Sequence, residues 1–139
     1  MPQELEMILR ILLAAGLGLI IGLQREWKEK PAGVRTLTLI SVGSALFAIV
    51  SGIGFDEGDP ARVAAGVVTG VGFLGAGAIL HRHGGVEGLT TAASIWAVAG
   101  IGLAAGAGLY LISVIVAVVI LAVLFIPHLP TPKDNGDKK

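Results

Sequence analysis

Long apolar stretches alternate with short polar segments along this chain of 139 residues. Such runs are typical of helices that cross a bilayer, whose hydrocarbon core of about 30 Å takes about 20 helical residues. The last run, 89–126, would extend about 57 Å as one helix, so we expect it to fold back at the glycine-rich segment 104–110. The pattern predicts an all-α, polytopic membrane protein, a five-transmembrane-helix bundle with spans at about 5–23, 36–54, 63–80, 89–105 and 109–126.

The segments between the apolar runs hold charges, prolines and turn residues. Pro31 and Pro60 lie in the first two connections, and a Gly-Gly pair lies in the third, 81–88. We expect all three connections to be loops. The proline-rich segment 127–139 has too little apolar surface to offset its ordering entropy, so we predict a short disordered cytosolic tail after a transmembrane domain over 1–126.

The lysines and arginines predict the orientation of the five spans. Cytosolic loops carry the excess of these residues, and an outside N-terminus with an inside C-terminus places all ten except Arg10 and Arg62 in the cytosol. Arg10 lies about five residues into the first span. We expect its side chain to lie along lipid and to reach the outer headgroups.

Composition supports a lipid environment and narrows the chemistry. Hydrophobic residues make up 54% of the chain and charged residues 14%, about half of their usual share in soluble domains. A net charge of zero argues against nucleic acid as a partner. Cysteine is absent, His81 and His83 lack a third fixed ligand, and no nucleophile has a base at usable spacing. We therefore expect no enzyme activity, no cofactor and no metal site.

The segment TGVGFLGAGAIL, 69–80, contains the spacing G-x-G-x-x-G. A dinucleotide-binding turn also needs a preceding strand and an acidic residue about 20 positions later, which this segment lacks. The glycines are instead compatible with two roles in a membrane. The first is close helix packing, because small residues let helix backbones approach in lipid. The second is a broken third helix that lines an ion pathway.

Both roles make specific residues important. Packing is favoured by G-x-x-x-G pairs on three different spans, which are Gly18 and Gly22, Gly66 and Gly70, and Gly102 and Gly106. A pathway is favoured by the dense glycines of the third span, which are Gly70, Gly72, Gly75 and Gly77.

Polar residues gather at the predicted cytosolic ends of the spans. Gln24, Arg25 and Glu26 precede the first connection, and Thr90 and Thr91 open the fourth span. We expect Arg35, with Thr36 and Thr38, to form a charge-assisted hydrogen-bond network with Glu26 or Glu87. The alternative is that these are ordinary juxtamembrane residues that set only position and orientation.

Three successive segments resemble the MgtC/SapB family of bacterial inner-membrane proteins. They are GLQREWKEKPAGVRTLTLISVGSALF, RVAAGVVTGVGFLGAGAIL and GLTTAASIWAVAGIGLAAGAGLY. The family often has Glu-Arg where this chain has Gln24-Arg25, which puts the role of that acidic position in doubt. The resemblance implies functional roles at the matching positions Arg25, Arg35, Thr36, Gly70, Gly72, Gly75, Gly77, Thr90 and Thr91.

The resemblance also implies a function. It indicates a non-catalytic regulator in a bacterial inner membrane, linked to magnesium homeostasis, low-magnesium growth, virulence and membrane energetics, with the F-type ATP synthase as a candidate partner. The alternative is a small ion transporter or channel that uses a glycine-broken third helix. Besides the lipid bilayer, we expect a second copy of the chain as a partner, in a homodimer.

Overall fold

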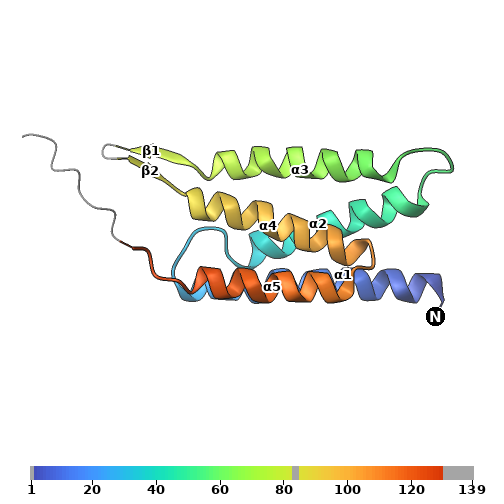
Figure 1. The fold of residues 1–139 in the computed structure, drawn as a ribbon, viewed down its shortest axis with the longest axis horizontal. Coiled ribbons are helices and arrows are strands. Elements are labelled where there is room, and N and C mark those ends of the chain that lie inside the picture. Colours follow the sequence, from blue (N-terminus) through green and yellow to red (C-terminus); the bar gives the residue numbers. More distant parts are fainter. Residues whose placement is uncertain (1, 83–84, 130–139) are drawn as a thin grey trace, which may run out of the picture.

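The computed structural model describes residues 2–82 and 85–129, which form an apolar, almost entirely helical bundle (Figure 1). Its helices run alternately in opposite directions, so that the end of α1, the starts of α2 and α4 and the end of α5 lie together. The elements within the described residues are α1 (Gln3–Trp27), α2 (Val34–Ile53), α3 (Pro60–Gly77), β1 (Leu80–Arg82), β2 (Gly85–Glu87), α4 (Leu89–Gly106) and α5 (Tyr110–Leu124).

Four of these helices, α1 to α4, are long and apolar enough to cross a membrane. Helix α5 is also apolar, but its 15 residues extend only about 22 Å. The chain is therefore a multi-pass membrane protein, while the fifth crossing and the orientation stay predictions. Residues 130–139 of the expected disordered tail lie outside the described residues.

The third connection is a β-hairpin where the sequence predicts a loop. Strands β1 and β2 pair antiparallel, with Leu80 opposite Glu87. Helix α3 ends at Gly77, three residues before the predicted end of the span, and the N–H of Ala78 bonds to the Gly75 carbonyl oxygen at 3.0 Å. The predicted span extended too far because hydropathy does not distinguish an apolar strand residue such as Leu80 from a residue at the end of a helix. The predicted loop was wrong because its residues pair as two strands.

Helix α3 is continuous, which contradicts the alternative of a glycine-broken third helix. It keeps α-helical geometry from Pro60 through Gly70, Gly72 and Gly75 to Gly77. A glycine costs about 1 kcal/mol relative to alanine inside a helix. A break exposed to lipid would leave backbone groups without hydrogen bonds, which costs several kcal/mol for each group. The helical conformation therefore prevails despite the five glycines of α3.

The tightest packing in the bundle joins α1, α2 and α4. A Cβ built on Gly18 would lie 2.9 Å from the Ser41 Cβ, closer than side chains pack in proteins. A Cβ on Gly102 would overlap the Ser41 carbonyl oxygen, and one on Gly106 would overlap that of Ala45. The packing role predicted for the glycine pairs of the first and fourth spans is therefore confirmed.

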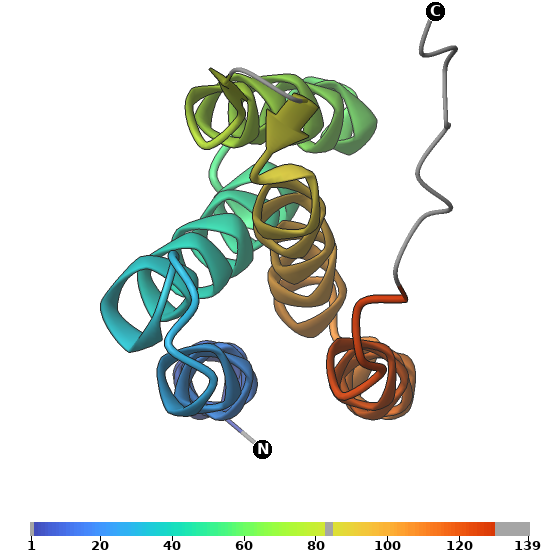
Figure 2. The same cartoon turned by 90° about the vertical axis from the view of Figure 1, so that its left-hand side faces the viewer.

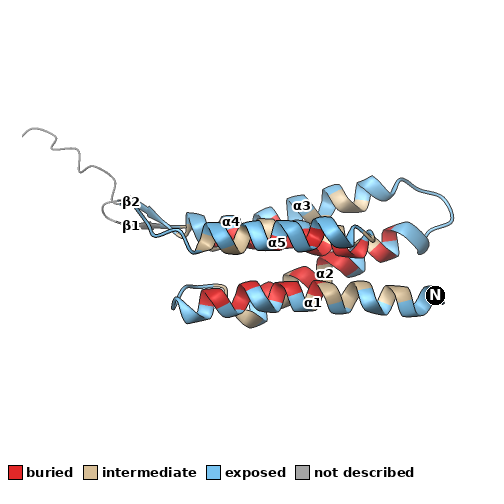
Figure 3. Ribbon diagram, turned by 60° about the horizontal axis from the view of Figure 1, so that its bottom comes forward, coloured by how far each residue is buried: buried red, intermediate tan, exposed pale blue. Residues whose placement is uncertain are grey.

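Helices α3 and α5 lie outside this three-helix centre. Figure 2 shows α3 at one edge of the bundle and α5 at the other, with α4 between them. Buried residues concentrate on the facing sides of α1, α2 and α4, whereas α5 is largely exposed (Figure 3). Exposed apolar side chains such as Phe73 and Leu111 are suited to contact with lipid.

Arg10 ties α1 to the turn between α4 and α5. Its Nη1 donates to the Gly106 carbonyl oxygen at 3.0 Å, its Nε donates to the Tyr110 hydroxyl at 3.2 Å, and it forms an ion pair with Glu6. Arg10 therefore also bonds to protein groups at this end of the bundle, and the reach of its side chain to the outer headgroups stays a prediction. The turn itself lies where the sequence predicts it, with Gly108 at a φ of +84° that favours glycine.

Candidate functional site

A buried arginine joins three elements where the end of α1 meets the start of α4. Arg25 lies in the last turn of α1 and is only 4% exposed. Its Nε and Nη2 donate to the Pro31 carbonyl oxygen at 3.2 and 3.0 Å, and Nη2 also donates to the Thr91 hydroxyl. Arg25 thereby connects α1, the α1–α2 connection and α4.

The α1–α2 connection is shaped to present this carbonyl. Glu29 and Ala32 have φ values of 55° and 58°, in the left-handed region, and the Lys30 N–H bonds to the Arg25 carbonyl oxygen at 2.9 Å. This hydrogen bond and the two left-handed residues turn the chain back, so that the Pro31 carbonyl oxygen faces Arg25. Within residues 2–82 and 85–129, no carboxylate lies within ion-pair distance of Arg25. Neutral oxygens therefore solvate its charge.

Gln24, the neighbour of Arg25, faces a different helix. Its side chain is 6% exposed, and its Nε2 donates to the Leu124 carbonyl oxygen of α5 at 3.2 Å. Its Oε1 is buried and has no hydrogen-bond partner among the residues that the structure describes, and the same holds for the hydroxyl oxygen of Thr38. Buried acceptors normally have a donor, so Gln24 Oε1 is the acceptor of this polar cluster to which a further donor could bind.

Glu26 caps a helix, which is a different role from the one predicted. Its Oε1 accepts a hydrogen bond from the Val34 N–H at 3.0 Å, at the first residue of α2. The N-cap residue, Gly33, has no side chain to do this, and a Cβ there would lie 2.5 Å from Glu26 Cγ. Glu26 thus satisfies one of the free N–H groups at the start of α2.

The predicted network around Arg35 does not form. Arg35, Thr36 and Thr90 are exposed, and Arg35 makes no side-chain hydrogen bond or ion pair with the part of the chain that the structure describes. The buried face of α2 begins at Leu37, and Arg35, two residues earlier, points elsewhere around the helix. Of the predicted polar residues, the structure brings Arg25 and Thr91 together.

Sequence reasoning missed two members of the cluster, Pro31 and Leu124. Both contribute backbone carbonyl oxygens, and no side-chain pattern marks such an acceptor. Pro31 was noted only as a loop residue, although its proximity to Arg25 in the chain is a usable signal. Leu124 is a hundred positions from Gln24, so only the fold reveals that contact.

The glycines predicted as a packing or pathway element of the third span have mixed environments. A Cβ on Gly75 would lie 3.3 Å from the Ala92 carbonyl oxygen, so this glycine allows α3 to approach α4. A Cβ on Gly66, Gly70, Gly72 or Gly77 would meet no atom of another described residue within 4 Å, apart from the backbone of its own helix. Within the described part of one chain, Gly75 is therefore the member of this set that packs closely against another helix.

The side chains of the cluster are suited to hydrogen-bonded recognition. They offer a guanidinium, a hydroxyl and an amide. Over residues 2–82 and 85–129, no group of three or more His, Cys, Asp or Glu side chains is placed to hold a metal ion. His83 lies outside the described residues.

Comparison with known proteins identifies relatives along most of the chain. "Putative magnesium transporter YhiD" of Escherichia coli is 48% identical over 131 residues, covering 88% of this chain and 61% of that protein. An uncharacterized protein of Haemophilus influenzae is 48% identical over 130 residues, with coverages of 86% and 55%. "Protein MgtC" of Salmonella typhimurium is 42% identical over 114 residues, with coverages of 82% and 49%. No solved structure matches the chain.

The family assignment rests on the same region. The chain spans between 49% and 61% of the length of these relatives. The profile of the MgtC family matches residues 11–129, which extend from α1 past the end of α5 and include the Arg25 cluster. The resemblance seen in the sequence is thereby confirmed, and this chain belongs to the MgtC family.

Proposed function

We propose that this protein is a non-catalytic regulator in the bacterial inner membrane, where it acts on another membrane complex in support of magnesium homeostasis. The observation that carries the proposal is the closed centre of the bundle. Gly102 and Gly106 of α4 lie directly against backbone carbonyl oxygens of α2, and Gly18 of α1 lies against Ser41. This packing leaves little room for a hydrated ion to pass between the three central helices.

The polar groups are placed for contact at the membrane surface. Arg25 is buried and holds the end of α1 to α4, whereas Arg35, Thr36 and Thr90 are exposed at the same end of the bundle. Under the positive-inside rule this end faces the cytosol. An exposed polar surface supported by a buried network is suited to docking on a partner, and the resemblance suggests the F-type ATP synthase as that partner.

Magnesium transport is the second candidate. The name of the Escherichia coli relative favours it, as do the unpaired oxygens of Gln24 and Thr38, since Mg²⁺ binds oxygen ligands. The continuous α3 removes the route through a broken helix. Transport would therefore need a path between copies of the chain or a rearrangement of the central helices.

A growth assay combined with an ATP synthase assay tests the regulator proposal. A bacterial strain that lacks its own MgtC-family protein would express this chain in low magnesium. We expect restored growth and a severalfold decrease of ATP-driven proton pumping in inverted membrane vesicles. Arg35→Glu should lose both effects, because charge reversal at the exposed polar end disrupts docking.

Glu4→Lys serves as the matched control, because it reverses an exposed charge at the opposite end of α1. This variant should behave as the wild type, with equal membrane insertion of all three proteins. If Arg35→Glu restores growth and lowers proton pumping as well as the wild type does, docking through this end of the bundle is wrong.

A further inference from the structure

Helix α3 presents an outward face that no part of the described chain covers. Gly66, Gly70 and Gly77 recur at helical spacing on this face and have open space beyond the Cα atom. Phe73 lies on the same face and is 82% exposed. The face therefore combines a depression over glycines with one large projecting ring.

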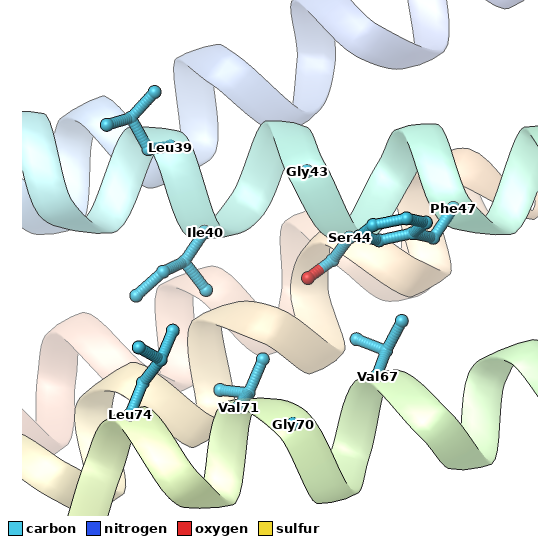
Figure 4. A pocket seen from close by; sticks show the side chains of 9 residues that line it. All are labelled: Leu39, Ile40, Gly43, Ser44, Phe47, Val67, Gly70, Val71 and Leu74. Carbon is cyan, nitrogen blue, oxygen red and sulfur yellow. The ribbon is translucent and has the colours of Figure 1, made fainter. Parts of the chain in front are cut away.

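A groove between α2 and α3 runs beside this face (Figure 4). It has a volume of about 350 Å³, and Gly43 of α2 and Gly70 of α3 lie on its opposite walls. Ser44 is the polar side chain in an otherwise apolar lining. It is 3% exposed, its hydroxyl points into the groove, and it makes no hydrogen bond with any described residue.

An unpaired hydroxyl in a groove at membrane depth favours a helix as the occupant over a lipid tail. A lipid acyl chain has no acceptor for the hydroxyl, whereas a closely packed helix brings carbonyl oxygens and polar side chains within reach. The walls also allow close approach, because glycine lies on both of them. The glycine pairs of α1 and α4 pack closely against the backbone of a neighbouring helix in the same manner.

We propose that the occupant is α3 of a second copy, so that α3 and the α2–α3 groove form a homodimer interface. Helix α3 itself borders the groove, and a two-fold axis parallel to it places the α3 of each copy in the groove of the other. Such an isologous contact requires a self-complementary surface. Phe73 supplies the projection and Gly70 and Gly77 supply the depression that receives it.

Charges at the start of α3 support a second copy over an unrelated helix. Arg62, Asp56 and Glu57 are exposed, and none of them forms an ion pair within residues 2–82 and 85–129. A parallel two-fold arrangement brings Arg62 of one copy toward the acidic connection of the other. Both signs of charge are therefore available at the same end of one surface. The interface does not depend on the proposed regulator function.

Two glycines of α3 give a matched pair of variants. Gly70 and Gly72 both have open space in the single chain, so leucine at either position leaves the fold of one copy intact. Gly70 lies on the proposed interface, and Gly72 lies on a different side of the helix. Gly70→Leu should weaken dimerisation in lipid bilayers at least tenfold, measured by energy transfer between labelled copies over a range of protein-to-lipid ratios. Gly72→Leu should leave it unchanged.

Cross-linking maps the same surface independently. The chain has no cysteine, so a single introduced cysteine forms disulfides only between copies. In oxidised native membranes, Gly66→Cys and Gly70→Cys should form covalent dimers, whereas Gly72→Cys and Val118→Cys on α5 should not. The proposal is overturned if the wild type stays monomeric at every ratio, if both leucine variants behave alike, or if cross-linking at Gly72 or Val118 equals that at Gly70.

Discussion

Gly102→Ala should destabilise the bundle by about 1–3 kcal/mol, and Gly102→Leu should prevent α2 and α4 from packing, because inserted carbon atoms have no room in a closely packed core. The Cβ of either residue would overlap the Ser41 carbonyl oxygen, which belongs to the backbone of α2 and cannot rotate away. Unfolding in mixed micelles with increasing sodium dodecyl sulfate would measure the loss.

Gly100→Ala is the control for this prediction. Gly100 is exposed on the same helix, and a Cβ there would meet no atom of another described residue within 4 Å, apart from the backbone of its own helix. Since alanine is the better helix former by about 1 kcal/mol, this variant should be as stable as the wild type or more stable. Equal stability of Gly102→Ala and Gly100→Ala would show that the close contact between α2 and α4 is absent.

Arg25→Met should lower the free energy of unfolding by about 1–3 kcal/mol, because the Pro31 carbonyl oxygen and the Thr91 hydroxyl would lose their buried donor. Methionine keeps much of the length of the side chain, which isolates the loss of hydrogen bonds from the loss of packing. The largest structural change should occur between the α1–α2 connection and the start of α4, which Arg25 holds together. Thermal unfolding in detergent, together with proteolysis in the α1–α2 connection, would detect both effects.

Arg35→Met tests whether removal of any arginine from this end has the same effect. Arg35 is exposed and makes no side-chain hydrogen bond or ion pair among the described residues, so we expect a change within about 0.5 kcal/mol. If both variants lose the same stability, the buried network of Arg25 does not hold the helix ends together. Arg25→Lys should be intermediate, because an ammonium group retains the charge without the planar geometry of a guanidinium.

The positions of the helices could be predicted because hydropathy and chain length suffice to locate apolar helices. The packing of Gly18, Gly102 and Gly106 also followed from spacing, since small residues four positions apart lie on one face of a helix. The continuous course of α3 did not follow, because the same glycines are compatible with a packed helix and with a broken one. The satisfaction of the backbone hydrogen bonds decided between them.

The polar contacts were less predictable than the helices. Arg10 bonds to a carbonyl oxygen 96 positions away, and Arg25 bonds to a hydroxyl 66 positions away. Sequence proximity favoured Arg35 as the centre of the network, because it stands beside two threonines. Arg35 lies on a different side of α2 from the buried residues, so it does not join the network. Which side a residue occupies depends on where the helix begins. Backbone acceptors such as the Pro31 carbonyl oxygen carry no signal in the side chains.

Magnesium flux into sealed proteoliposomes tests most directly the claim that the bundle regulates rather than conducts. The purified protein would be reconstituted beside a known magnesium channel as a positive control, with insertion verified by labelling of single cysteines. We predict no saturable Mg²⁺ entry above that of protein-free vesicles, from protein that restores low-magnesium growth in cells. Saturable Mg²⁺ entry that disappears in Arg25→Met would contradict this claim and make this chain a transporter.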